Sequence, residues 1–248
     1  IENDLKTCLE SINVEFDGFI LEPLASASSV LDDNEKELGI ALLDIGGGTT
    51  DIILYNNNSV IHTAAIPLGG MIITNDIAVT LKIPLECAEE LKCTNGLAKE
   101  SLADEENNIT IKGMNDRKDI QISQKKLSSI IEARMIEIFH LAKSEIKKCE
   151  NKGEINFGVV ITGGGSHLKN IEDLAKEVFA LDIKIGKPNS INGIDDIINN
   201  PRYATTIGLI KYVHENNVRS NSELNEELDL VDIGRGLVNK ILKYFKLK

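Results

Sequence analysis

The chain has 248 residues, of which 42% are hydrophobic and 27% charged, and its formal net charge is −12. This composition is typical of a globular protein with one large domain or two small ones. The negative charge argues against nucleic-acid binding, which requires a basic surface. No apolar run is long enough for a transmembrane helix, and no signal peptide pattern opens the chain.

Hydrophobic periodicity and turn residues predict alternating helices and strands. The expected elements are a helix over 1–13, a strand over 16–21, a helix over 22–31, a charged turn over 32–37, strands over 40–44, 51–55 and 59–66, and helices over 71–81 and 84–93. A polar stretch over 94–123 with a small sheet follows, then a long helix over 124–149, a strand over 157–162, a helix over 168–179, a strand over 183–185 and a helix over 203–213. This alternation predicts a layered α/β fold.

Residues that commonly bind metals do not cluster in the sequence. The four cysteines lack zinc-site spacing, and we expect them to be reduced and mostly buried. The four histidines have no Cys or Asp partner at metal-ligand spacing and are interpreted as structural or surface residues. The signatures GxxxxGK[ST], GxSxG and HExxH are absent, so a Walker-type ATPase is not supported.

The most informative segment is LLDIGGGTTDIILY, residues 42–55. Three glycines lie between two apolar strands and leave the turn open to a bulky anion, which backbone N–H groups can bind. The turn consists of Gly46, Gly47, Gly48 and Thr49. Asp44 ends the first strand beside it, and a carboxylate next to a phosphate site indicates Mg²⁺ between the two. The alternative is a tight glycine hairpin without a ligand.

Three weaker patterns are consistent with a nucleotide site. A second glycine run, Gly163, Gly164 and Gly165, follows an apolar strand and precedes a helix, whose N-terminus favours anions. Glu22 lies at a strand-to-helix junction, where its carboxylate is placed to orient water toward a phosphate. The alternative is that this acidic residue only stabilises the start of the helix.

The third pattern is Glu89 with Lys92 on one helix face. These two side chains are suited to a ribose and an adenine edge. The alternative is a surface ion pair without a ligand.

The last residues, VDIGRGLVNKILKYFKLK, contrast with the acidic remainder. The polar stretch before them, 214–230, is typical of a flexible linker or of a surface helix. As a helix, the tail has a broad apolar face that includes Leu237, Val238, Ile241, Leu242 and Phe245, beside the basic residues Lys240, Lys243 and Lys246. This pattern suits an anionic membrane surface. The alternatives are a last helix packed on the protein's own core and a helix bound in a partner's groove.

The order of five segments along the chain is more informative than any one of them. In sequence they are FILEPLASASSVL, ALLDIGGGTTDIILY, AEELK, VVITGGGSHLKNI and PRYATTIGLIKY. This order resembles the superfamily of actin, heat-shock chaperone and sugar-kinase ATPases. The segment IPLGGMIITNDIAVTLKIPLECAEELK, the run IGKPNSINGIDDIINNPRYATTIGLI and the basic tail are similar to the FtsA family of bacterial actin-like cell-division proteins. The resemblance spans nearly the whole chain and implies an α/β, actin-like ATPase fold with an RNase H-like sheet.

The resemblance also implies domain boundaries. Residues 1–31 would form the end of a first actin-like domain and its connecting helix. The core of the second domain would consist of 32–81 and 155–200, with an inserted α+β subdomain at 82–154. After the core would come a second crossing helix over 201–213, a linker over 214–230 and a membrane-targeting amphipathic helix over 231–248. A first phosphate loop and a subdomain that takes part in filament contacts would lie upstream. We therefore expect these residues alone to bind ATP weakly or undetectably.

By motif, the resemblance assigns a role to each candidate residue. The turn over 46–49 matches a phosphate loop, Asp44 the acid that holds hydrated Mg²⁺, and Glu22 the position near the attacking water. Glu89 and Lys92 match ribose and adenine contacts, and 163–165 matches the adenosine loop.

The function that the resemblance implies is adaptor rather than enzyme. Such a protein binds ATP and Mg²⁺, polymerises head to tail and tethers the C-terminal tail of the tubulin-like FtsZ to the inner face of the bacterial membrane at the septum, alongside other division proteins. Hydrolysis is expected to be slow at most. The FtsZ tail is expected to dock on 82–154, where Arg134 is suited to an acidic peptide unless it pairs with Glu137 or simply lies exposed on the surface.

Three other functions fit parts of the sequence. A small-molecule kinase of the same superfamily should line the cleft with residues specific for its substrate. A pilus-assembly ATP-binding adaptor shares the core, but it gives no reason for the amphipathic tail. A chaperone needs a peptide-binding domain after the ATPase part, where only 214–248 follow.

Overall fold

The computed structural model of the chain describes residues 2–14, 18–112, 119–149, 155–189 and 199–220, with only the backbone of 215–220. Its helices are α1 (Glu2–Ser11), α2 (Glu22–Val30), α3 (Asp33–Leu38), α4 (Gly70–Leu81), α5 (Leu85–Asn95), α6 (Gln124–Lys147), α7 (Ile171–Phe179) and α9 (Ala204–Ser220), with short 3₁₀ helices η1 (Glu100–Leu102), η2 (Gly164–His167) and η3 (Pro201–Tyr203). Its strands are β1 (Ile40–Ile45), β2 (Thr50–Asn56), β3 (Ser59–Ile66), β4 (Asn108–Ile111), β5 (Ile120–Ser123), β6 (Val159–Thr162) and β7 (Ile183–Ile185).

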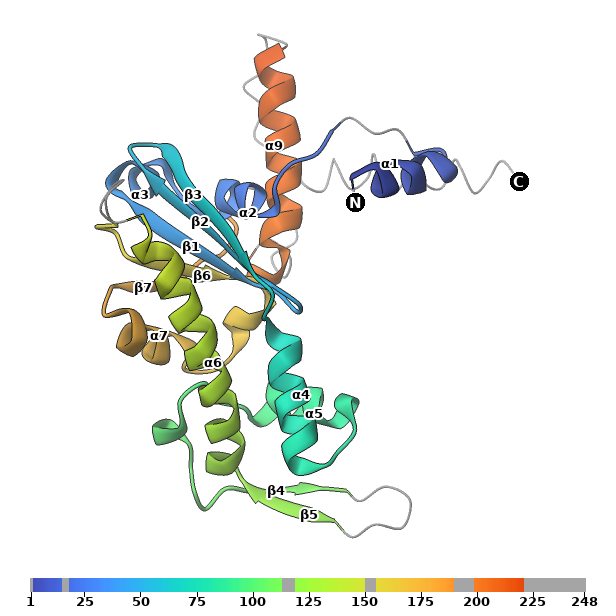
Figure 1. Cartoon of the computed structure of the whole chain (residues 1–248), viewed down its shortest axis with the longest axis vertical. Coiled ribbons are helices and arrows are strands. Elements are labelled where there is room, and N and C mark those ends of the chain that lie inside the picture. The colour runs from blue at the N-terminus through green and yellow to red at the C-terminus, as the bar shows by residue number, and fades with distance from the viewer. Residues whose placement is uncertain (1, 15–17, 113–118, 150–154, 190–198, 221–248) are drawn as a thin grey trace.

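A five-stranded mixed sheet forms the centre of the fold (Figure 1). Its strand order is β3-β2-β1-β6-β7. The first three strands form an antiparallel meander, and the predicted hairpin between β2 and β3 is confirmed. In contrast, β6 and β7 run parallel to β1, because helices connect them.

Helices cover both faces of the sheet, which explains why β1 is buried along its whole length. Because side chains alternate along a strand, Ala41, Leu43 and Ile45 belong to one core and Ile40 and Leu42 to another. The first core contains residues of α4, α6 and α7, and the second contains residues of α2 and α9. The protein is therefore a three-layer α/β/α structure.

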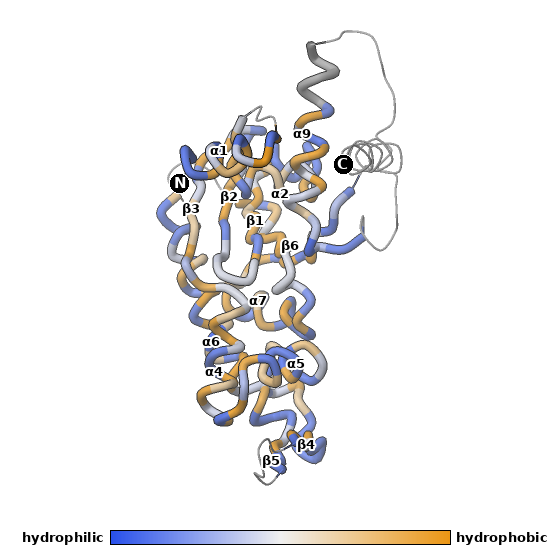
Figure 2. Tube along the Cα trace, turned by 90° about the vertical axis from the view of Figure 1, so that its right-hand side faces the viewer, coloured by the Kyte–Doolittle hydropathy of each residue, from blue (hydrophilic) through white to orange (hydrophobic). Residues whose placement is uncertain are grey.

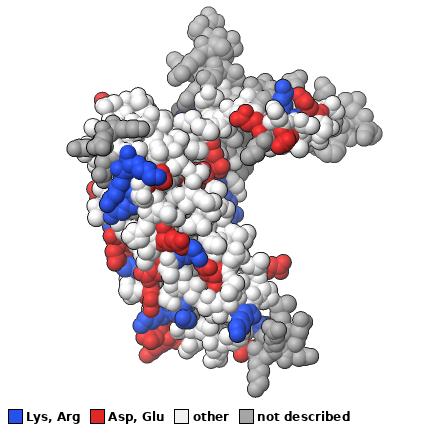
Figure 3. Space-filling model, in the orientation of Figure 1, with Lys and Arg blue, Asp and Glu red and all other residues white. Residues whose placement is uncertain are grey.

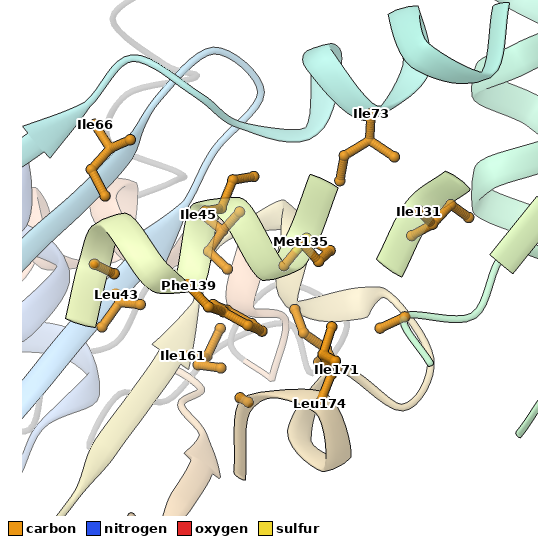
Figure 4. Close-up of a cluster of buried hydrophobic side chains, with 14 of the residues drawn as sticks. Leu43, Ile45, Ile66, Ile73, Ile131, Met135, Phe139, Ile161, Ile171 and Leu174 are labelled. Carbon is orange, nitrogen blue, oxygen red and sulfur yellow. The ribbon is translucent and has the colours of Figure 1, made fainter. Parts of the chain in front are cut away.

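The larger core is centred on α6. Phe139 of this helix is fully buried, and its ring centroid lies 5.4 Å from that of Phe179 at the end of α7. Figure 4 shows Phe139 close to Ile161 of β6, with Met135 farther along the same helix. Aromatic and branched side chains from three elements thus fix α6 and α7 against the sheet.

The chain below the sheet in Figure 1 is called here the lower lobe: residues 70–112 and 119–136, which include α4, α5, the β4–β5 hairpin and the first half of α6. Bidentate hydrogen bonds from Arg134 on α6 to Asp76 on α4 tie two of its helices together. Figure 2 shows hydrophobic residues concentrated in the sheet and its helices and a mostly hydrophilic chain near β4 and β5. On the face in Figure 3, basic and acidic side chains lie in small adjacent groups.

Several predictions of local structure were wrong. Residues 18–21, the described part of the predicted strand over 16–21, have no regular structure. The predicted turn over 32–37 is instead the helix α3, because Asp32 and Glu35 form a capping box at its start. The last helix continues to Ser220, seven residues beyond the predicted end at Val213, so the predicted linker begins within it.

Two predictions about burial also need correction. The apolar residues that recur at helical spacing over 124–149 include Leu141, and this spacing predicts Leu141 on the buried face of the helix. Leu141 is instead 42% exposed, and Phe139 takes the central position. Of the four cysteines, only Cys149 is buried, whereas Cys8 and Cys93 are exposed. All four are free thiols.

Candidate functional site

The two glycine turns lie side by side because the strands before them are neighbours. Parallel pairing of β1 with β6 places Asp44 opposite Thr162, so both strands end at the same edge of the sheet. Gly163 then approaches β1 so closely that a Cβ there would lie 2.3 Å from Asp44 Oδ1 and 2.6 Å from the carbonyl oxygen of Ile45. Its φ of 82° also favours glycine.

The first glycine turn is held through its carbonyl groups. The N–H groups of Gly70 and Met71, at the start of α4, donate to the carbonyl oxygens of Gly46 at 2.9 Å and Gly47 at 2.8 Å. Within the described residues, the N–H groups of Gly47 and Gly48 donate to no protein acceptor. The turn is therefore fixed in place while two of its amides remain available to an anion.

A single cleft of about 660 Å³ brings together most of the predicted site residues. Its lining includes Glu22, Asp44, Gly46, Gly47, Glu89, Lys92, Gly163, Gly164 and Gly165. Gly48 and Thr49 do not line it, and the Thr49 hydroxyl donates to Asp51 instead. The cleft thus joins segments from both ends of the chain, as the predicted order of motifs requires.

Asp44 is only 6% exposed and is the most buried of the acids that line the cleft. Its Oδ2 accepts hydrogen bonds from the hydroxyls of Ser26 on α2, at 2.6 Å, and Thr205 on α9, at 3.2 Å. Burial raises the pKa of the Asp44 carboxyl above its usual range, the two hydrogen bonds oppose this shift, and the charge of Asp51 adds to it.

Three carboxylates meet at this edge of the sheet. Antiparallel register places Asp44 directly opposite Asp51 on β2, a like-charge pair that is unfavourable without a cation. Glu22 is exposed, but partial desolvation raises its pKa as well, and the charges of Asp51 and Asp44 raise it further. Such a donor set fits a cation held largely by water and phosphate oxygens, as Mg²⁺ usually is. Among the described residues, no three His, Cys, Asp or Glu side chains are grouped closely enough to hold a metal directly.

Glu89 and Lys92 form an ion pair, which was the alternative to contacts with a ribose and an adenine edge, but the pair lines the cleft. The Lys92 ammonium donates to Glu89 at 2.7 Å, to the Thr74 hydroxyl at 2.8 Å and to the Gly70 carbonyl oxygen at 2.9 Å. Burial raises the pKa of Glu89, but hydrogen bonds from Lys92, Thr74 and Cys93 outweigh this effect and the net pKa is lowered. Lys92 thus holds both Glu89 and the start of α4 in position.

Sequence reasoning missed several residues of the cleft, such as Thr205, and also Ser26, which does not line the cleft but donates to Asp44. Ser26 and Thr205 lie on helices about 180 residues apart in the chain, and no motif connects them. His167, which was interpreted as structural or surface, lines the cleft, and its Nε2 lies 2.8 Å from Asn200 Oδ1. Arg202 and Lys169 also line it. The only available signal was the position of His167 two residues after the second glycine turn.

Arg134, the candidate contact for a partner peptide, already has acidic partners. Its guanidinium donates to both carboxylate oxygens of Asp76 and to Glu137 at 2.5 Å. Hydrogen bonding to Asp76 raises the pKa of Arg134. This geometry favours the alternative structural interpretation, so a role in peptide binding stays a prediction.

The predicted membrane residues between Leu237 and Lys246 lie outside the described residues. Within the part of the chain that the structure describes, no helix combines the length and the apolar character needed to cross a bilayer.

The sequence matches known proteins over most of its length. The family model described as Cell division protein FtsA matches residues 41–208. The chain belongs to the FtsA family. It is 39% identical over 209 residues to the cell division protein FtsA of Pseudomonas aeruginosa and 39% identical over 208 residues to that of Neisseria meningitidis serogroup B. Each alignment covers 84% of this chain and 50% of the relative, so the chain spans about half the length of the curated FtsA proteins it matches.

Solved structures confirm the predicted fold. MreB 5 of Spiroplasma citri bound to AMPPNP superimposes with a TM-score of 0.72 at 20% identity, covering 88% of this chain and 66% of that chain. This FtsA-family chain therefore has the actin-like ATPase fold.

Proposed function

We propose that this FtsA-family chain supplies one wall of an ATP site. The observation that carries the proposal is the shared cleft, in which both glycine turns, Asp44 and the Glu89–Lys92 pair face one volume of about 660 Å³. That volume is typical of small-molecule sites. The MreB structure with similar fold binds AMPPNP, which supports a nucleotide as the ligand.

Each part of the cleft has a proposed role. The free amides of the turn over 46–49 bind phosphate oxygens, and the turn over 163–165 lets the nucleotide approach the backbone. Glu89 and Lys92, on α5, contact the ribose and the adenine edge. Glu22, whose raised pKa reflects partial desolvation and acidic neighbours, orients water near the terminal phosphate.

Mg²⁺ is the proposed cation, and Asp44 holds it through water. When bound, Mg²⁺ would neutralise phosphate charge and the repulsion among Asp44, Asp51 and Glu22. The chain's own contribution is to hold Asp44 rigidly and keep its Oδ2 hydrogen-bonded.

The proposal for the whole protein follows from its family. ATP orders two domains around itself, the protein polymerises head to tail, and the subdomain over 82–154 binds the FtsZ tail. Residues 231–248 anchor the assembly to the cytoplasmic face of the membrane at the division septum. The domain boundaries given above are part of this proposal, with the second crossing helix extended to Ser220.

Asp44→Asn is expected to separate stability from ligand binding. Because the pKa of Asp44 is raised in the folded state, that state holds the proton more tightly than the unfolded state, so stability falls as pH rises from the ordinary carboxyl range through the folded pKa. The variant should therefore be more stable than the parent at pH 7, by a difference that shrinks on acidification. Urea unfolding at several pH values measures this.

The same variant tests the nucleotide site. In calorimetry on the whole gene product, ATP affinity with Mg²⁺ should fall about tenfold to hundredfold in Asp44→Asn, with a smaller change in EDTA. A parent protein that binds no ATP under either condition contradicts the proposed function.

Membrane binding is expected to depend on 231–248. The protein should float with anionic vesicles, whereas a truncation that lacks these residues should not, because each near-surface cation contributes about 1 kcal/mol and the apolar face adds more. Lys240→Glu combined with Lys243→Glu should reduce flotation without removing the apolar face. If the truncated protein still floats, the membrane lies against another surface.

A further inference from the structure

Asp44 faces the helices α2 and α9 because of its place along β1. Ile40 and Leu42 point to the core shared with these helices, and Asp44 is the next residue in that alternation. At this end of the strand, the side chains of α2 and α9 that contact β1 are polar rather than apolar: they are the hydroxyls of Ser26 on α2 and Thr205 on α9. The acid is therefore in contact with both helices at once.

Ser26, Thr205 and Asp44 form a closed triangle of polar contacts, in which the two hydroxyls donate to the carboxylate and lie next to each other. Ser26 Oγ lies 2.9 Å from Thr205 Oγ1, and both hydroxyls reach the same carboxylate oxygen, Asp44 Oδ2. Each hydroxyl has one proton to donate, so the two protons serve three contacts. Because Oδ2 accepts both hydroxyls, Oδ1 is the oxygen left to face the second glycine turn, next to Gly163.

The two helices cross at very short range. A Cβ on Gly208 of α9 would lie 1.8 Å from the carbonyl oxygen of Ala25 on α2. The Ser29 hydroxyl also links the helices, by donating to the Ala204 carbonyl oxygen at 2.7 Å. A small change in the crossing of α2 and α9 would therefore separate Ser26 from Thr205 and break the triangle.

We propose that Ser26 and Thr205 are a positioning pair that orients Asp44 for its hydrated cation and couples cation-dependent nucleotide binding to the crossing of α2 and α9. This inference rests on the proposed ATP site. When the helices cross as described, two donors hold Oδ2 and direct Oδ1 to the cleft. When they separate, Asp44 keeps at most one of these donors. By linkage, a ligand that requires the held carboxylate stabilises the crossing in return.

The matched control is Ser29. Like Ser26, it is a fully buried serine of α2 whose hydroxyl contacts α9, but it does not contact Asp44. Ser29→Ala removes an interhelical hydrogen bond and leaves the triangle intact. Thr205→Val removes the second hydroxyl at nearly constant side-chain size, whereas Thr205→Ser keeps a hydroxyl at this position.

The experiment measures ATP affinity of the whole gene product by calorimetry, with Mg²⁺ and with EDTA. We expect Ser26→Ala and Thr205→Val to lower the Mg²⁺-dependent gain in affinity about tenfold, because each removes a hydrogen bond to a charged group. Ser29→Ala and Thr205→Ser should keep that gain, and binding in EDTA should change little in all four variants.

A second readout follows the helices directly. Hydrogen exchange over 22–30 and 204–212 should slow when Mg²⁺ and ATP are added to the parent and to Ser29→Ala, and much less in Ser26→Ala. If the parent binds ATP with Mg²⁺ and Ser26→Ala keeps both the gain in affinity and the slowed exchange, the positioning pair is wrong while the proposed function stands. If the parent binds no ATP, both proposals fall.

Discussion

Gly163→Ala is expected to lose about 3 kcal/mol of folding free energy and most nucleotide affinity. The backbone at Gly163 has φ 82° and ψ 176°, a region that only glycine occupies without strain of about 1–3 kcal/mol. The added Cβ would also meet Asp44 Oδ1 and the Ile45 carbonyl oxygen, so β1 and the turn after β6 would have to separate. Urea unfolding measures the stability, and calorimetry with ATP measures the binding.

The neighbouring glycine is the control for this prediction. A Cβ on Gly164 has no other atom within 4 Å, so Gly164→Ala should unfold within about 0.5 kcal/mol of the parent. It should still weaken ATP binding, because its methyl group enters the cleft. Equal stability of Gly163→Ala and the parent would contradict the described approach of the two turns.

Lys92→Met is expected to lose about 2–3 kcal/mol of stability and to weaken ATP binding. The Lys92 side chain is 13% exposed and makes three hydrogen bonds, two of which join α5 to Gly70 and Thr74 at the start of α4. Its loss leaves the Gly70 carbonyl oxygen without this donor and removes the cation that lowers the pKa of Glu89. Since Gly70 and Met71 also hold the first glycine turn, the damage should reach the phosphate site.

Lys125→Met is the comparison for this variant. Lys125 pairs with Glu105 at 3.1 Å, but both side chains are largely exposed, so the loss should be below about 1 kcal/mol. Thermal unfolding of the two variants in parallel, with and without ATP, separates the two effects. Lys92→Met with unchanged ATP affinity would assign Lys92 a purely structural role.

The sequence predicted the central sheet well because its strands are strongly patterned. The strands β1 and β2 are apolar runs on either side of the glycine turn, and such runs form strands wherever both faces are covered. The more exposed β3 follows an asparagine turn, which predicts a hairpin with β2. The long helix was also clear, since α6 repeats apolar residues over many turns. In both cases, local pattern and tertiary packing favour the same structure.

The wrong predictions of local structure concern segments whose sequence patterns are short or were judged from their polar and charged composition alone. At 32–37, high charge indicated a turn, although Asp32 followed by Glu35 is a helix-start signature that was present in the sequence. The polar residues after Val213 indicated a linker, yet polar sequences continue a helix readily once it has begun.

The candidate site was only partly predictable for a different reason. Asp44 and the glycine runs are visible as motifs, because the backbone itself must be bare near a phosphate. Ser26, Thr205 and Asp51 act through their positions on opposite strands and crossing helices. Those positions depend on sheet register and on the close contact at Gly208, which a single sequence does not display.

The helix α6 joins the lower lobe to the sheet as one continuous rod. Its 24 residues correspond to about 36 Å, from the β5 end of the lower lobe to the core beside β1. Hydrogen bonding of the Ala98 amide to the Lys169 carbonyl oxygen makes a second connection between the same two parts. A pulling force applied to the β4–β5 hairpin would therefore be transmitted through α6 and the Ala98–Lys169 hydrogen bond to the residues beside the glycine turns. In the head-to-tail filament proposed above, mechanical load would be transmitted directly to the edge of the sheet where the nucleotide is proposed to bind.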